Sequence, residues 1–255
     1  MEAELKRQYF KILAEELVPA LGCTEPIAIA LASAKAREVL GVMPERIVAK
    51  CSGNLVKNVK CVIVPNTDDL VGIEASAIMG AVGGDCSKGM EVLGGVTEDQ
   101  IREANELYKK GICAVELLDT PLNLHLIIEA YAGDDSAVVE VKNLHDNITF
   151  ISRNGKTLFE SNERDGLYYG VLTDRSVLTF DRIYDFAETT PIEELKAVFA
   201  TQIEDNMAIA EEGLTGKYGV GIGAALIAND KSVFGKVKAY ASAASEARMG
   251  GCVLP

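Results

Sequence analysis

A cysteine, a threonine and a carboxylate follow one another at the predicted start of a helix. Cys23 precedes Thr24, Glu25 and Pro26. A threonine N-cap, an acidic first turn and an early proline are typical of a helix start. The unpaired N–H groups and the positive end of the helix dipole favour the thiolate, which is the form of cysteine that attacks carbon or binds metal. We therefore expect Cys23 to be reactive or ligating. The alternative is a buried cysteine that packs as a small apolar side chain.

Two further polar side chains follow the next predicted strand, residues 46–51. Ser52 and Asn54 flank Gly53. A glycine beside two polar side chains suits the binding of an anion or a carboxylate, although an ordinary turn would contain the same residue types. His145, in a later predicted turn, could contact a ligand or could simply be solvated.

The remaining cysteines and histidines form no known metal or disulfide pattern. The two histidines, His125 and His145, match neither H-E-x-x-H nor H-x-x-x-H. No C-x-x-C pair occurs among the six cysteines, which are Cys23, Cys51, Cys61, Cys86, Cys113 and Cys252. The sequence therefore argues against a zinc ribbon, a disulfide framework and histidine-based metal or triad chemistry.

Hydrophobic periodicity predicts helices at both ends of the chain and a mixture of helices and strands in its middle. Residues 154 and 155 are Asn-Gly, a strong signal for a type I′ hairpin. The glycine and alanine content of residues 218–228 predicts a buried helix. Helices are predicted over about 5–17, 25–40, 71–83, 97–110, 181–187, 190–212, 218–228 and 232–249, and strands over 46–51, 61–65, 114–118, 124–131, 137–143, 148–151 and 157–159.

These elements indicate an α+β fold. We expect an alanine-rich helical domain built from residues 1–42 and 187–255. Inserted into it is an α+β domain of residues 43–186 that contains an antiparallel sheet. Because residues 1–41 and 190–250 are alanine-rich helical segments too apolar to stand alone, we expect them to pack against each other.

The composition excludes several classes of function. The 255 residues are 48% hydrophobic and 25% charged, as in an ordinary soluble globular protein. The formal net charge of -13 would repel a phosphate backbone. No run approaches the ~18 apolar residues of a membrane span, and the charged N-terminus lacks a signal-peptide core. We expect a cytoplasmic protein with neither a nucleic-acid nor a membrane partner.

Four stretches of the chain resemble one known family. Residues 21–26 (Leu-Gly-Cys-Thr-Glu-Pro) are similar to the N-terminal signature of the L-cysteine desulfidase family, which is related to the α chain of iron–sulfur L-serine dehydratases. Residues 51–58, 80–85 and 247–251 resemble the same family. The resemblance implies a lyase that converts L-cysteine to pyruvate, ammonia and sulfide, or L-serine to pyruvate and ammonia. It implies an oxygen-sensitive 4Fe-4S cluster and no pyridoxal phosphate (PLP).

The resemblance also implies roles for particular residues. Cys23 matches the N-terminal ligand of the cluster, the metal site, and Thr24 and Glu25 are its neighbours in the catalytic motif. Glu25 could orient the site or bind the substrate amine, or it could interact only with the helix dipole. Ser52 and Asn54 are the candidates for contacts with the amino-acid substrate.

The chain departs from the family pattern at its end. Family members continue into a Gly-Ser-Gly-Asn motif and a region with two more ligand cysteines, whereas this sequence stops at Pro255. Cys252 lies where the family places no regular ligand. We therefore expect the chain to need a C-terminal segment or a partner chain, and a homodimer is also open. The alternative is a non-catalytic small-molecule-binding or assembly module that keeps the fold without the cluster.

Overall fold

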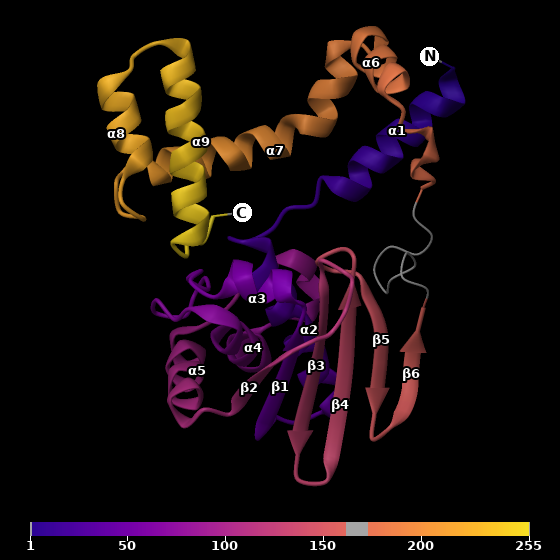
Figure 1. Ribbon diagram of the computed structural model, residues 1–255, viewed down its shortest axis with the longest axis vertical. Helices are drawn as coiled ribbons and strands as arrows, with labels where there is room; N and C mark the ends of the chain where they lie inside the picture. The colour runs from indigo at the N-terminus through magenta and orange to yellow at the C-terminus, as the bar shows by residue number, and fades with distance from the viewer. Residues whose placement is uncertain (1, 162–172, 255) are drawn as a thin grey trace.

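The computed structural model describes residues 2–161 and 173–254, and it has the α+β fold that the sequence predicts (Figure 1). Most predicted helices and strands are present, and η1 and η2 are short 3-10 turns. The elements are, in chain order, α1 (Ala3–Glu16), α2 (Thr24–Leu40), β1 (Arg46–Cys51), α3 (Gly53–Val59), α4 (Gly72–Gly83), η1 (Cys86–Glu91), α5 (Glu98–Lys110), β2 (Cys113–Leu117), β3 (His125–Ala132), β4 (Asp135–Lys142), β5 (Ile148–Arg153), β6 (Lys156–Glu160), η2 (Arg175–Val177), α6 (Phe180–Thr189), α7 (Ile192–Gly213), α8 (Ile222–Asn229) and α9 (Val233–Met249).

The strands form one six-stranded sheet in the order β2-β1-β3-β4-β5-β6. Every neighbouring pair is antiparallel except β1 and β2, which run parallel. The three helices and the 3-10 turn between them in the chain provide the long crossover that a parallel pair needs. The β5–β6 hairpin turns at Asn154 and Gly155, with φ of 50° and 73°. Two successive positive φ angles agree with the predicted type I′ turn.

Helix α2 lies at the centre of the core. It packs against α4 and against strands β3 and β4, so that α2 and α4 together lie over one face of the sheet (Figure 1). Ile27, Ile29 and Leu31 are fully buried although they point in different directions around the helix. A helix that is apolar on all sides belongs in a core rather than on a surface, and the alanines let its neighbours approach closely.

Helix α1 lies apart from this core, beside α6 and α7 (Figure 1). The Tyr9 ring lies 5.0 Å from that of Phe186, and Lys6 pairs with Glu194 at 2.8 Å. The expected packing of the N-terminal residues on the C-terminal helices is therefore confirmed for α1 and, through a hydrogen bond from Arg248 to the Gly22 carbonyl, for the connection after it. For α2 the expectation was wrong, since this helix is buried between α4 and the sheet. The division of the chain into two domains stays a prediction.

Several local predictions are corrected. Residues 61–65 form no strand: Ile63 makes only isolated bridges, to Val71 and Gly250. The positive φ angles at residues 66, 68 and 69 turn the chain away at once and prevent a longer ladder. Ser52 precedes the helix α3 rather than forming a turn. Thr190 is the C-cap of α6 instead of the N-cap of α7.

The helices α6 to α9 expose many apolar side chains. Helix α8, which was predicted to be buried, buries only Gly223. Phe180 is 82% exposed, Val220 87% and Phe234 77%. Patches of this kind on a soluble domain mark contacts with another part of a protein or with a partner. Within the described ranges, no helix is both long enough and apolar enough to cross a membrane.

Replacing the cap of α5 should cost measurable stability. Thr97 Oγ1 accepts a hydrogen bond from the Gln100 backbone N–H at 3.4 Å, and Gln100 Oε1 accepts one from the Thr97 N–H at 2.9 Å. Thr97→Ala leaves an N–H group of the first turn without its partner, and should lower the free energy of unfolding by about 1 kcal/mol in urea titrations. Glu103→Ala, on an exposed position of the same helix, is the control and should change it little. An unchanged unfolding midpoint for Thr97→Ala would contradict this expectation.

Candidate functional site

Cys23 is the N-cap residue of α2, one position earlier than the predicted cap Thr24. Its side chain is half-buried and caps no backbone N–H group. Instead the thiol donates to Glu25 Oε2, with an Sγ–O distance of 3.4 Å. The cysteine is thus held by a carboxylate two residues along the chain, at the first turn of the helix.

Glu25 is the centre of the cluster. The Thr24 hydroxyl donates to its Oε2 at 3.3 Å, and the Asn58 amide donates to its Oε1 at 3.1 Å. Burial disfavours the ionised carboxyl. Hydrogen bonds from the Glu25 backbone N–H, the Asn58 amide and the Cys23 thiol outweigh this effect, so the pKa of Glu25 lies below its usual value. Glu25 is therefore a carboxylate with several donors at neutral pH. Hereafter the Glu25 cluster means Cys23, Thr24, Glu25 and Asn58.

The structure reverses the expected acidity of Cys23. Burial, the charge of Glu25 and the hydrogen bond to Glu25 raise the pKa of the thiol to about 11, although backbone N–H groups of Glu25 and Thr24 lower it in part. The helix N-terminus is present as predicted, but a carboxylate within hydrogen-bond distance and the loss of solvent are stronger. The expectation of an unusually reactive thiolate was wrong for this chain without a bound cation.

His145 lies near the cluster, at the turn between β4 and β5. It interacts electrostatically with Glu25 and with its neighbour Asp146. Burial lowers the pKa of His145, and the two carboxylates offset this in part, so its imidazole is a neutral proton acceptor at pH 7. The interpretation as a simply solvated turn histidine is not supported, since the side chain is largely withdrawn from water.

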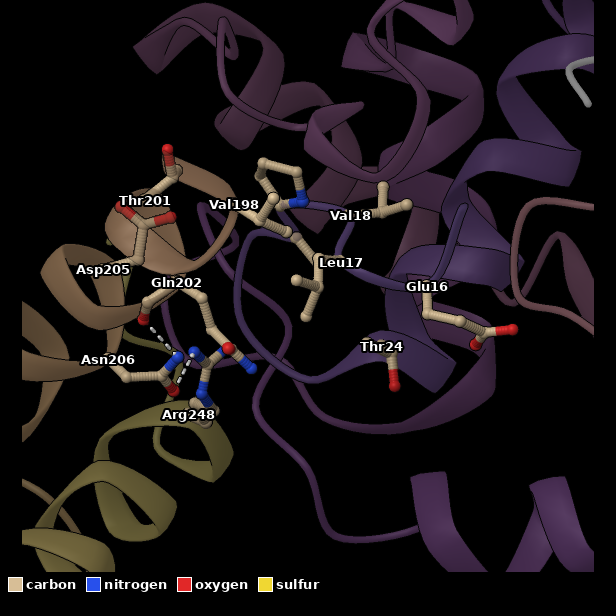
Figure 2. A pocket seen from close by; sticks show the side chains of 12 residues that line it. Glu16, Leu17, Val18, Thr24, Val198, Thr201, Gln202, Asp205, Asn206 and Arg248 are labelled. Atoms are coloured by element: carbon tan, nitrogen blue, oxygen red, sulfur yellow. Dashed lines mark hydrogen bonds between the residues drawn. The ribbon is translucent and has the colours of Figure 1, made fainter. Parts of the chain in front are cut away.

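A cavity of about 370 Å³ opens next to the cluster, and Thr24 belongs to both (Figure 2). Its walls come from the connection between α1 and α2, from the start of α2, and from α7 and α9. The volume is within the range of small-molecule sites. Figure 2 shows Gln202, Asn206 and Arg248 grouped on one side, with Leu17 and Val18 forming an apolar part of the wall.

The predicted substrate contacts lie away from this cavity. The Ser52 side chain is buried and donates to the Asn123 carbonyl at 2.7 Å, while Asn54 is exposed. Neither lines the cavity. Their role as substrate contacts stays a prediction.

Sequence reasoning missed two residues of the site. Asn58 stands in the same family-like stretch as Ser52, four residues after Asn54, and Arg248 stands in the stretch 247–251. The resemblance of these two stretches was the signal that could have identified both residues. His145 was named as a possible ligand contact, but only from its residue type and its place in a turn.

The side chains that could bind a metal are scattered over the described part of the chain. Such a cluster takes several thiolates, whereas no group of three or more histidine, cysteine or acidic side chains in residues 2–161 and 173–254 could hold a metal ion. Cys23 has one carboxylate beside it. Of the other cysteines, Cys61 is exposed and the rest are buried: Cys51, Cys86, Cys113 and Cys252.

The fold and the site together define an α+β protein with a cysteine–carboxylate cluster beside a small-molecule cavity. Homologues of this chain are named UPF0597 proteins. The chain is 46% identical to the one from Lachnoclostridium phytofermentans, over 98% of this chain and 60% of that protein. For the Treponema denticola protein the identity is 42% over 97% of this chain and 59% of the relative, and for Fusobacterium nucleatum it is 41% over 100% and 61%.

The chain thus spans about 60% of the length of the curated relatives it matches. Their names state no activity, so the resemblance to the L-cysteine desulfidase family stays a prediction. No protein-family model matches the chain, and no solved structure matches it.

Proposed function

We propose that this chain is the N-terminal part of an iron–sulfur-dependent lyase that converts L-cysteine, or L-serine, to pyruvate and ammonia, with sulfide released from cysteine. One observation carries the proposal: the thiol that the family resemblance assigns as a cluster ligand is hydrogen-bonded to an ionised carboxylate, and the residue after it, Thr24, lines a cavity of small-molecule size. A buried thiol held by a carboxylate is a poor nucleophile but a suitable metal ligand, since a cation offsets both charges.

In this proposal, the chain's own residues hold the Cys23 thiol in position and supply a proton acceptor. Glu25 holds the Cys23 side chain and is itself held by Asn58 from α3, so the thiol has a fixed direction. The neutral imidazole of His145 interacts electrostatically with this carboxylate and is our candidate for the group that accepts a proton. When bound, an iron–sulfur cluster with an open iron supplies a Lewis acid. This chain contributes one ligand, so the other thiolates must come from outside these 255 residues.

The proposal requires a further segment or a partner chain, with a homodimer as another route. The exposed apolar residues of α6 to α9 support it, because a surface of this kind needs a cover. The relatives are long enough to supply one, since about 40% of their length lies outside the match. We place the enzyme in the cytoplasm, with an amino-acid substrate and without a nucleic-acid partner, as the charge of -13 suggests.

One observation favours the second candidate, a non-catalytic small-molecule-binding or assembly module. Cys23 is the only cysteine of the cluster, and its pKa of about 11 keeps it protonated at neutral pH. A protein that binds an amino acid without metal would have the same cavity and would need no thiolate.

The deciding experiment measures sulfide released from L-cysteine by the protein extended to the length of its relatives, after anaerobic reconstitution with iron and sulfide. We expect visible absorption near roughly 400 nm and lyase activity in the extended protein. Cys23→Ala should abolish both, whereas Cys61→Ala, at an exposed cysteine, should change neither. The 255-residue chain alone should stay colourless and inactive.

Two outcomes would reject the lyase. An extended protein that is active with Cys23→Ala would remove the ligand assignment. An extended wild-type protein that binds amino acids but takes up no iron and releases no sulfide would favour the second candidate, the non-catalytic binding module.

A further inference from the structure

Arg248 lines the cavity from the last turn of α9 and is held in place from two sides. Its Nη1 donates to the Gly22 carbonyl at 3.4 Å, and its Nη2 donates to Asn206 Oδ1 at 3.3 Å (Figure 2). Both bonds are long, and both partners are neutral. A guanidinium has five N–H donors, so these two bonds fix its direction and leave donors for a ligand.

The charge of Arg248 is not balanced by a neighbouring acid. Among residues 2–161 and 173–254, Arg248 forms no ion pair, whereas the half-buried Arg175 pairs with both Glu15 and Glu16. Acidic residues outnumber basic ones by 38 to 25 in this chain. A half-buried arginine that lines a cavity and has no ion-pair partner among the described residues is therefore unusual in this acidic chain, and it suits a carboxylate brought by a ligand.

A negative group lies on the same cavity. Asp205 precedes Asn206 on α7, lines the cavity and forms no ion pair within the described part of the chain. Thr24 lines the cavity as well and connects it to Glu25. The cavity thus has one guanidinium, two carboxylates and, at Thr24, a direct neighbour of Cys23. Of the carboxylates, Glu16 is already paired with Arg175, which leaves Asp205 for a ligand. An α-amino acid has the complementary pair of charges on adjacent groups.

We propose that Arg248 binds the α-carboxylate of an amino-acid substrate and that Asp205 binds its ammonium group. This inference deepens the proposed lyase and rests on it for the identity of the substrate. The geometry directs the substrate's side chain towards Thr24, which follows Cys23 in the chain, because the charged groups on α7 and α9 occupy the other wall (Figure 2). Arg248 and Asp205 therefore determine specificity for a zwitterion, and neither takes part in breaking a bond.

The test is calorimetric titration of the 255-residue chain with L-serine, which avoids thiol oxidation, and with ethanolamine, which lacks the carboxylate. L-Serine should bind, and Arg248→Gln should weaken it by about tenfold or more, because a charge-assisted contact is lost. Arg248→Lys keeps the charge without the forked geometry, so its affinity for L-serine should lie between those of the wild type and Arg248→Gln. Ethanolamine should bind weakly, and equally, to wild type and Arg248→Gln.

Arg102→Gln is the matched control, since Arg102 is exposed and, among the described residues, forms its ion pair with Asp99 on the surface of α5. It should bind L-serine as the wild type does. Asp205→Asn should weaken L-serine and leave propionate, which has no ammonium group, unchanged. Thermal unfolding of each variant by circular dichroism separates lost binding from lost folding.

The inference and the lyase can fail separately. Cys23→Ala should still bind L-serine, because the charged groups that hold it lie elsewhere. If L-serine binds through Arg248 but the extended protein releases no sulfide, the lyase fails and the binding site stands. If wild type binds no L-serine, or if folded Arg248→Gln binds it unchanged, the binding site is wrong whatever the result for sulfide.

Discussion

Gly80→Ala is expected to destabilise the protein by about 3 kcal/mol or more, a cost at the upper end of overpacking effects. A Cβ atom on Gly80 would lie 2.2 Å from the Ala30 carbonyl oxygen and 2.6 Å from the Ala30 Cα. Both atoms belong to the backbone of α2, so no side chain can rotate away. Helices α2 and α4 would have to move apart, which loosens the packing of the fully buried residues between these two helices. The gain of about 1 kcal/mol that alanine gives in a helix does not offset this.

Gly53→Ala is the matched control. Gly53 is the first residue of the helix α3, and a Cβ atom there would meet only Leu117 Cδ1, at an ordinary 3.9 Å. Alanine should be tolerated there and could add a few tenths of a kcal/mol. Urea unfolding followed by circular dichroism measures both variants. An unfolding midpoint for Gly80→Ala equal to that of Gly53→Ala would show that α2 and α4 do not touch at this glycine.

Local signals account for the parts of the fold that the sequence predicted. Helix α5 has an apolar stripe and a capping box within its own residues, and the turn at Asn154 needs only the Asn-Gly pair. For α2 the helix itself was equally clear. Its partner was not, because a run of alanines suits any closely packed neighbour. Only the tertiary structure decides between α4 with the sheet and the C-terminal helices.

In the site, too, the sequence predicted residues that are adjacent in the chain but not contacts between residues far apart in it. Cys23, Thr24 and Glu25 are consecutive, so the sequence places them together. Asn58 reaches Glu25 from 33 residues away, and Arg248 reaches Gly22 from 226 residues away. No sequence pattern within a single chain indicates such contacts. The helix α3 also changes which side chains face the site, since a turn at residues 52–54 would have presented Ser52 and Asn54, whereas the helix presents Asn58.

Cys23 is expected to react slowly with iodoacetamide at pH 7.5. Burial and Glu25 raise its pKa from 9.0 to about 11. At this pH the thiolate fraction falls about tenfold for each pKa unit, so it should be roughly 100-fold lower than for an unperturbed thiol. Cys61 is exposed and should be alkylated first. Peptide mass spectrometry over a time course gives the rate for each cysteine, and a Cys23 rate above that of Cys61 would contradict the raised pKa.

Glu25→Gln tests the cause of this low reactivity. This change removes the negative charge that stabilises the thiol form and leaves only a neutral amide oxygen as acceptor, so Cys23 should react several times faster at pH 7.5, while burial, the largest cause, remains. Glu38→Gln is the matched control, because Glu38 accepts a hydrogen bond from the Cys86 thiol at 2.7 Å and, after burial, raises the pKa of Cys86 to about 11. It should accelerate Cys86 and leave Cys23 unchanged. If Glu25→Gln instead leaves the Cys23 rate at its wild-type value, the carboxylate does not hold the thiol, and the Glu25 cluster cannot serve as a preformed metal ligand.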